Sequence, residues 1–443
     1  MNGEANSGKG VLIAVFIAVS IVYVALFFQF QRHPVTGALS GASDFSCIYW
    51  VGKVALSHDR LRIYDLALQA SYDASLDAEL APGNHFTRHR FIFPPFVLLL
   101  YAPLALLSYA HAVAVWYALN VALLLSFPFL LRGVLQLGNR SLALALLITP
   151  LFLPVLNQLG QGQMSILLLL IFTLTYRYLA QSMDLRAGSM LALATFKPQF
   201  VLLLLLVLVL TRNWKALQGF TATCGGLLAV SVGLVGWRAT LGYPQAMLQF
   251  SHLPAKLGGE VPEVMFNLRG FIVDTFGSHL SGRELHSVIL LASAALLSLA
   301  LIPFVRRQPR ISAMGFSLIV TVTLLASYHA YVHDMTLLLL PFLLLASYIA
   351  ETDLTPLRLA MALTGGSLFI ITSIYPPWFP ICLLLFSVTL FLETLRINTS
   401  ELPVKIKELR PACVAGATGY AAGGSVSLSH TGVRGESSDI SVG

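Results

Sequence analysis

The stretch GASDFSCIYWVGKVALSHDRLRIYDL, residues 41–66, decides how this chain is organised. It opens a largely polar segment that runs on to Pro95 and lies between long apolar runs. Six of the chain's 20 acidic residues lie in this segment: Asp44, Asp59, Asp65, Asp73, Asp77 and Glu79. Because carboxylates are costly inside a bilayer, a membrane protein places them in water or in a functional site. We therefore expect a large loop outside the membrane, following a first span.

The composition is that of a membrane protein. Of the 443 residues, 57% are hydrophobic and 11% are charged, and the mean hydropathy is +0.79. Soluble domains carry about 25% charged residues. Apolar runs such as 11–28, 200–210 and 290–302 recur along the chain. With ~20 residues needed for each spanning helix, we expect an all-α polytopic membrane protein with about 12 transmembrane helices. A membrane β-barrel would show shorter, alternating segments.

Basic clusters set the expected orientation. The net charge of +7 does not indicate a nucleic-acid partner, because the basic residues lie in short clusters between apolar segments, as membrane orientation requires. Placing Arg212–Lys215, Arg306–Arg310 and Lys405–Arg410 in the cytoplasm puts both termini inside. One conflict remains, because four arginines then fall outside: Arg132, Arg140, Arg177 and Arg186. Either a half-helix is hidden within 93–163, or the rule is weak there.

The domain prediction follows from these segments. Residues 1–396 form the membrane domain, with outer loops at 31–92 and 237–284, and residues 397–443 form a disordered cytoplasmic tail, poor in large apolar residues. The four cysteines contain no CxxC pair, so buried thiols are favoured over disulfides or metal ligands. The expected spans are approximately 10–30, 93–107, 110–131, 141–156, 164–178, 188–210, 216–235, 285–305, 312–326, 331–350, 357–373 and 378–395.

Asp44 is the candidate reactive carboxylate. It follows the first expected span and precedes an aromatic run that ends at Leu56. A carboxylate at the water–membrane boundary, beside apolar and aromatic side chains, can take a proton from a sugar or lipid hydroxyl. Ser43 or Asp44 could also cap a helix, and the two roles are compatible.

Two cations are candidates for holding a phosphate. Lys197, in Lys197-Pro198-Gln199, lies about mid-way along the expected span 188–210, where a lysine costs roughly 3 kcal/mol and must face a cavity or a partner. Pro198 should kink the helix there. Lys197 could bind a lipid phosphate or only pair with a buried polar group. Arg269, in Asn267-Leu268-Arg269-Gly270, could grip phosphate with its planar fork, although a lone loop arginine is usually only solvated.

Three further segments carry candidate substrate-binding residues. Tyr64-Asp65 is by itself typical of a turn, and Gly160-Gln161-Gly162-Gln163 of a loop whose glycines allow close backbone approach. The run 327–334, SYHAYVHD, is dense in titratable groups. His329 and His333 share a helix face only if the helix starts early. With no third ligand at a matching spacing, proton handling or sugar binding is favoured over a metal site.

Together these motifs resemble glycosyltransferase family 87 of the GT-C superfamily. The matching pieces run in the family's order from about Ser43 to Pro341: SDFSCIYWVGKVAL, IYD, FIFPPFVLLLYAPLALLS, GQGQMSILLLL, TFKPQFVLLLLL before the basic RNWK, FNLRGFI and SYHAYVHDMTLLLLP. The last two expected spans and the tail carry no such motif. Other members of the family can carry histidine where this chain has Val332-His333-Asp334.

The resemblance implies a GT-C-like hexosyltransferase of the plasma (inner) membrane. It would move a sugar, with mannose expected, from a polyprenyl-phosphate donor to a lipid or glycan acceptor on the extracytoplasmic face, with Asp44 as general base. We expect Lys197 and Arg269 near the donor phosphate and no cofactor. The expected substrate contacts are Tyr64, Asp65, Gln163, Asn267, Tyr331, His333 and Asp334. A transporter or lipid flippase is the alternative, because such proteins often contain broken helices around a midplane site. A non-catalytic scaffold would leave Lys197 unexplained.

Overall fold

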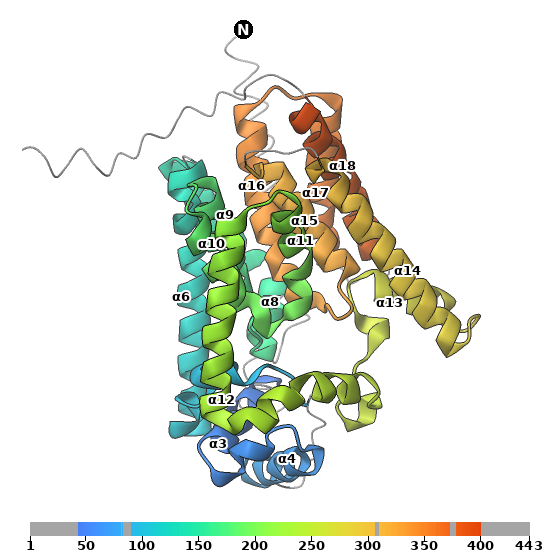
Figure 1. The fold of residues 1–443 in the computed structure, drawn as a ribbon. Coiled ribbons are helices and arrows are strands. Elements are labelled where there is room, and N and C mark those ends of the chain that lie inside the picture. Colours follow the sequence, from blue (N-terminus) through green and yellow to red (C-terminus); the bar gives the residue numbers. More distant parts are fainter. Residues whose placement is uncertain are drawn as a thin grey trace, which may run out of the picture. The chain divides into compact units, whose positions relative to one another are not determined.

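The computed structural model describes residues 43–80, 82, 90–135, 137–305, 310–372 and 378–399. These residues all belong to the first of two units, 1–399 and 400–443. Their regular structure is entirely helical, as predicted (Figure 1). The expected first span, most of the basic cluster 306–310, and the tail from residue 400 with Cys413 lie outside the described residues. Cys47, Cys224 and Cys382 are free thiols, of which Cys47 is buried.

The α-helices are labelled as in Figure 1. They are α3 (Phe45–Ala55), α4 (Leu66–Leu80), α5 (Leu98–Tyr101), α6 (Tyr109–Leu135), α7 (Asn139–Ile148), α8 (Leu153–Gln161), α9 (Ser165–Ala180), α10 (Asp184–Leu193), α11 (Leu202–Leu210), α12 (Trp214–Ser251), α13 (Leu268–Phe276), α14 (Gly282–Leu301), α15 (Ala313–Ala326), α16 (Leu339–Glu351), α17 (Pro356–Ile371) and α18 (Phe379–Thr399). Shorter 3-10 turns are η1 (His58–Arg62), η2 (Pro95–Val97), η3 (Leu104–Leu106), η4 (Thr149–Leu151), η5 (Ala194–Phe196), η6 (Pro198–Phe200), η7 (Ala255–Leu257), η8 (Pro262–Val264), η9 (Ile302–Phe304) and η10 (Val332–Leu338).

Several helices are long and apolar enough to cross a membrane, which makes this an integral membrane protein. In the described part of the chain there are five such helices: Tyr109–Leu135, Trp214–Ser251, Gly282–Phe304, Val332–Glu351 and Phe379–Asn398. A sixth passage is made if α7 and α8, which are bent by 54° at their junction, act as one span. Shorter apolar helices include α9, α15 and α17. From residue 285 onward, the helices α14 to α18 match the five spans expected there.

The expected span 93–107 is not a continuous helix, so this prediction is wrong. The segment forms η2, the four-residue α5 and η3. Pro94 is extended, Pro95 begins η2, and Pro103 precedes η3. Proline lacks an amide donor and clashes with the preceding turn of a helix, so it interrupts the apolar run that suggested a span.

The expected span 188–210 is also wrong, because the chain folds back on itself there. The helix breaks at Lys197, whose backbone angles are φ −126° and ψ 75°, just before Pro198. At the other end, Gly188 of α10 packs so closely on α12 that a Cβ atom would lie 1.7 Å from the Ala216 carbonyl oxygen. The start of α10 therefore lies beside the start of α12, and residues 211–213 join the end of α11 to the same place. Helices α10 and α11 are the two arms of a hairpin (Figure 1). Lys197 lies between η5 and η6 at the tip that joins the arms.

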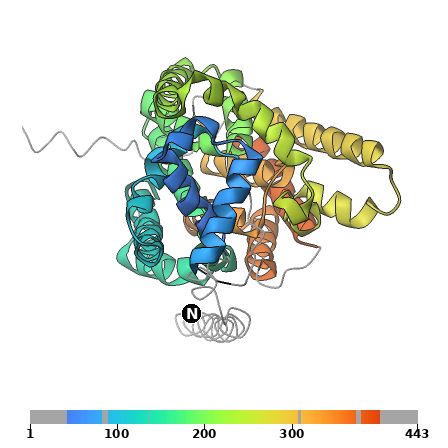
Figure 2. The same cartoon turned by 90° about the horizontal axis from the view of Figure 1, so that it is seen from below.

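Helix α12 extends well beyond the expected span 216–235. It includes a break at Gly236, with φ 77° and ψ 163°, and continues as a second helical part to Ser251. The predicted outer loop 237–284 therefore begins as helix and goes on through η7, η8 and α13. Helix α12 contacts both η1 and η2. In the view from below, α3 and α4 lie across this end of the helices, next to the second part of α12 (Figure 2).

Candidate active site

A chamber of about 1350 Å³ lies at the end of the helices that carries α3. Its walls come from α3, from the α8–α9 connection, from the tip of the α10–α11 hairpin, from the second part of α12 and from the turn before η10. Five residues predicted from the sequence line it: Asp44, Gln163, Lys197, Tyr331 and His333. Segments far apart in the sequence thus contribute to one cavity.

Asp44 stands at the start of α3, but its side chain does not cap that helix. Its Oδ2 atom instead accepts a hydrogen bond of 2.7 Å from Gln163 Nε2. The next residue, Phe45, is fully buried, and its ring lies 5.8 Å from the Tyr109 ring and 6.1 Å from the Trp116 ring, centroid to centroid. Aromatic packing thus fixes the start of α3, and the carboxylate is left on the chamber wall.

The α8–α9 connection is clamped against the start of α3. Gly162 ends α8 in the left-handed conformation, with φ 72°, and its carbonyl accepts a 2.8 Å hydrogen bond from Trp116 Nε1. A Cβ atom at Gly162 would lie 2.6 Å from the Phe45 Cβ. Both the conformation and the close approach require glycine. The backbone next to Gln163 is therefore fixed, which places the Gln163 side chain beside Asp44.

Gln158 holds the same connection from the other side, and sequence reasoning missed it. Its fully buried amide donates from Nε2 to Asn120 Oδ1 at 3.0 Å and to the Gln163 carbonyl at 2.5 Å. Its Oε1 accepts from the Ser165 amide at 2.9 Å. Because its amide group already bonds Asn120 and the backbone of Gln163 and Ser165, Gln158 orders the α8–α9 connection rather than binding substrate.

Lys197 and Asp334 form a buried ion pair between Nζ and Oδ1, with side chains only 6% and 0% exposed. Asp334 also accepts from Ser165 Oγ at 2.9 Å and from the Tyr331 amide at 3.1 Å. Asp334 does not line the chamber, whereas Lys197 does. Lys197 therefore pairs with a buried carboxylate, as expected if its role is structural. It also lines a cavity, as expected if it binds a phosphate.

His333 lies beside this pair on the chamber wall. Its Nδ1 is 2.9 Å from Gln161 Oε1, and its Nε2 is 3.5 Å from Asp334 Oδ2. Because η10 begins at Val332, His329 precedes the helix and the two histidines do not share a helix face. Within the described ranges, no group of three or more His, Cys, Asp or Glu side chains is arranged to hold a metal ion.

Arg269 does not line the chamber but stands behind Glu260, which does. It forms a buried ion pair with Glu260, donates to the Tyr328 carbonyl at 3.1 Å, and stacks on the Tyr328 ring at 3.8 Å. The other carboxylate oxygen of Glu260 is 3.0 Å from His329 Nδ1. Burial opposes ionisation of Glu260, but the hydrogen bond and charge of His329, with the charge of Arg269, lower its pKa overall. No sequence motif singled out Glu260.

Three other predicted residues make structural contacts away from the chamber lining. Asn267 caps α13 by accepting from the Gly270 amide, and its Nδ2 donates to the Ser327 carbonyl at 2.8 Å. Asp65 accepts from the amides at the start of α4 and pairs with an exposed arginine, Arg62, which lowers its pKa. Tyr64 donates its hydroxyl to the Phe93 carbonyl at 2.7 Å. These contacts tie the first loop and α13 to their neighbours.

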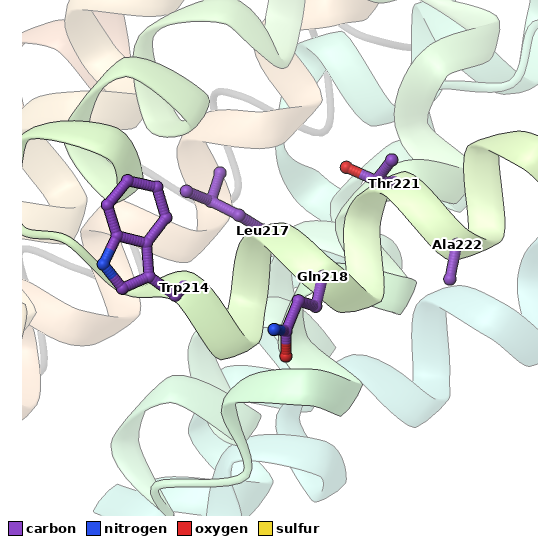
Figure 3. A pocket seen from close by; sticks show the side chains of 5 residues that line it. All are labelled: Trp214, Leu217, Gln218, Thr221 and Ala222. Carbon is purple, nitrogen blue, oxygen red and sulfur yellow. The ribbon is translucent and has the colours of Figure 1, made fainter.

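A second recess lies on α12 alone. Figure 3 shows its lining side chains, which all project from the first turns of that helix: Trp214, Leu217, Gln218, Thr221 and Ala222. None of these five side chains is acidic, basic or nucleophilic under ordinary conditions, so the recess offers no chemistry to compare with the chamber.

The comparison with protein families supports the resemblance. The model of glycosyltransferase family 87 matches residues 91–327, more than half of the chain. This chain belongs to glycosyltransferase family 87. The match includes Gln163, Lys197 and Arg269, whereas Asp44 precedes it and His333 follows it. No curated protein and no solved structure matches the chain. Family membership makes the protein a membrane glycosyltransferase that uses a sugar donor and an acceptor.

Proposed function

We propose that this glycosyltransferase moves a sugar, with mannose expected, from a polyprenyl-phosphate donor to a hydroxyl of a lipid or glycan acceptor. The observation that carries the proposal is the Asp44 carboxylate, which lines the same chamber as Lys197 and His333. The chamber, at about 1350 Å³, is larger than the roughly 300–1,000 Å³ of an ordinary small-molecule site. It therefore has room for the heads of both substrates.

In the proposed reaction, Asp44 takes the proton of the acceptor hydroxyl. The acceptor oxygen bonds to the anomeric carbon from one side while the bond from that carbon to the phosphate oxygen breaks on the other, which inverts the configuration. The electron pair leaves with the polyprenyl phosphate, which needs cations and hydrogen-bond donors rather than a proton. Asp44 then returns its proton to water.

Of the cationic side chains that line the chamber, Lys197 is the one that we assign to the donor phosphate. Because Asp334 already offsets its charge, Lys197 would contribute directed hydrogen bonds more than net charge. Arg269, the second candidate, would act through Glu260 and His329, which stand between it and the chamber. Tyr331 and His333 are the wall residues that we assign to the sugar or the acceptor.

A revised membrane topology supports a chamber on the extracytoplasmic face. If the shorter apolar helices α9, α15 and α17 cross as well as the six passages already described, the described residues make nine passages: α6, α7–α8, α9, α12, α14, α15, η10–α16, α17 and α18. The predicted first span then makes ten rather than twelve. The α10–α11 hairpin enters from the cytoplasmic side and returns to that side, so it does not count as a passage. Arg132, Arg140, Arg177 and Arg186 then join Arg212 in the cytoplasm, at the end of the helices away from Asp44. The conflict with the positive-inside rule disappears.

The test uses purified protein in nanodiscs, polyprenyl-phosphate [³H]mannose and vesicles of lipid extracted from the native membrane. Release of polyprenyl phosphate and labelled product are both measured. Asp44→Asn should fold but lose about 10²–10⁴-fold in turnover. Asp59→Asn is the matched control, because Asp59 lies in the same loop but does not line the chamber. Normal turnover in a well-folded Asp44→Asn variant would remove the base from the mechanism, and movement of intact donor between leaflets would favour a flippase.

A further inference from the structure

Helix α12 is too long to be a single membrane passage. At 1.5 Å per residue, its 38 residues would extend about 57 Å if straight. The hydrocarbon core of a bilayer is about 30 Å thick. Residues 214–235 alone would extend about 33 Å and would already cross it. The helix breaks at the next residue, Gly236, so its second part, residues 237–251, is free to take another direction.

The second part of α12 begins at the chamber end of the molecule. Gly236 lies beside η1, where a Cβ atom on it would be 3.5 Å from Leu61 Cδ2. Further along, the Tyr243 ring is 6.1 Å from the Tyr64 ring, centroid to centroid. Figure 2 shows this part running across the same end as α3 and α4. After crossing the bilayer, the chain must either leave for water here or lie along the membrane surface.

The side chains of residues 237–251 divide into three stripes. The first stripe is exposed and apolar, at helical spacings of four, three and four: Trp237, Leu241, Pro244 and Leu248. Trp237, Leu241 and Leu248 are 60%, 66% and 65% exposed. The second stripe is exposed and polar: Arg238, Gln245 and Gln249. The third stripe faces the protein or the chamber: Thr240, Tyr243, Met247 and Phe250.

Pro244 and Leu248 belong both to the exposed apolar stripe and to the lining of the chamber. They therefore mark the edge at which the outer surface of the helix turns into the chamber wall. A lipid chain that left the chamber over this edge would pass the apolar side chains of Pro244 and Leu248. The polar stripe of Arg238, Gln245 and Gln249 does not line the chamber.

We propose that residues 237–251 lie along the outer surface of the membrane, with the apolar stripe in the acyl layer. Pro244 and Leu248 form the threshold over which the lipid chain of a substrate passes between membrane and chamber. Continuity with the membrane-crossing part of α12 identifies lipid as the occupant. Trp237 stands at the start of the stripe with the Arg238 guanidinium 5.4 Å from its ring, a pairing suited to the headgroup region. The surface position is independent of the proposed function, whereas the threshold rests on it.

Spin labels test the surface position. In the full chain, freed of its native cysteines and reconstituted in nanodiscs, labels are attached singly at Leu241, Leu248, Gln245 and Gln249. We expect oxygen to relax the labels at Leu241 and Leu248 more strongly. A water-soluble nickel complex should relax the labels at Gln245 and Gln249 more strongly. If all four are equally accessible to nickel, the helix lies in water. If the spectra of the labels at Leu241 and Leu248 broaden through spin–spin contact between two protein molecules, a second copy of the protein covers the apolar stripe. Either outcome overturns the proposal.

Donor length tests the threshold. Leu248→Asp should raise KM several-fold for polyprenyl-phosphate mannose but leave KM for geranyl-phosphate mannose unchanged, because the short chain does not need the path. Gln249→Asp is the control and should change neither. Equal effects on both donors, or none, would refute the threshold. A wild-type protein that transfers sugar from neither donor would refute the proposed function instead, and the spin-label pattern would still decide the surface position.

Discussion

Removing the charge of Lys197 tests how the hairpin tip is held in the chamber wall. Lys197→Met keeps the length and apolar stem of the side chain and removes the ammonium group. Asp334, with a fully buried side chain, then loses its ionic partner. Ser165 Oγ and the Tyr331 amide still donate to its carboxylate.

The size of the effect follows from burial. Breaking a buried ion pair by removing one partner costs about 3–5 kcal/mol, because an uncompensated charge is left behind. Since two donors still solvate Asp334, we expect the lower end, about 3 kcal/mol. At roughly 2 °C per kcal/mol for a large domain, the melting temperature should fall by about 6 °C. Adding Asp334→Asn removes the orphaned charge and should restore most of this loss.

The double variant also separates stability from binding. Thermal unfolding and polyprenyl-phosphate binding are measured on the same nanodisc preparation, with binding at low temperature. If Lys197 also donates to the donor phosphate, the stable double variant should bind it about 1.5–3 kcal/mol more weakly. This corresponds to about a 10- to 150-fold loss of affinity. Asp334→Asn alone keeps the lysine and should retain binding.

Three outcomes would contradict parts of this reasoning. A Lys197→Met variant that melts with the wild type would show that the ion pair does not stabilise the fold. A double variant as unstable as Lys197→Met would assign the loss to packing of the lysine stem rather than to charge. Unchanged donor binding in the double variant would show that Lys197 does not bind the donor phosphate.

The remaining predictions concern the base, the loop network and the orientation. Gln163→Ala should lower kcat about 10-fold or more with little change in KM, because a hydrogen bond to a charged group is worth about 1.5–3 kcal/mol; a raised KM with normal kcat would make Gln163 a substrate ligand instead. Because the pKa of Glu260 is lowered on folding, its stabilising effect is present above its ordinary pKa of about 4.5 and is lost as the pH falls through the lower folded value. Glu260→Gln should therefore melt earlier than wild type at pH 7 but converge with it in acid, whereas exposed Glu263→Gln should match wild type at both; a constant difference would exclude titration of Glu260. In a cysteine-free chain, a cysteine at Gly258 should be labelled from outside intact cells and one at Gln308 should not, and the reverse pattern would invert the orientation.

Sequence reasoning succeeded where the relevant physics is local. The apolar runs after residue 285 predicted helices α14 to α18, because transfer into lipid depends on the composition of about 20 neighbouring residues. The break at Lys197-Pro198 was also readable, because proline acts on its own turn. The same local reasoning wrongly predicted single membrane spans at 93–107 and 188–210. An apolar run that is long enough to cross a membrane can instead be interrupted by proline or fold back on itself.

By itself, the sequence determined a helical membrane protein of glycosyltransferase family 87 with an acid-rich segment near its start. Only the tertiary structure decided which charges meet. Lys197 and Asp334 are 137 residues apart and pair because the hairpin tip packs beside η10. Glu260 and Arg269 pair because the chain turns through η8 into α13. Hydropathy and helix breaking are properties of neighbouring residues, whereas the pairing of charges and the lining of a chamber depend on how the folded chain brings separate segments together.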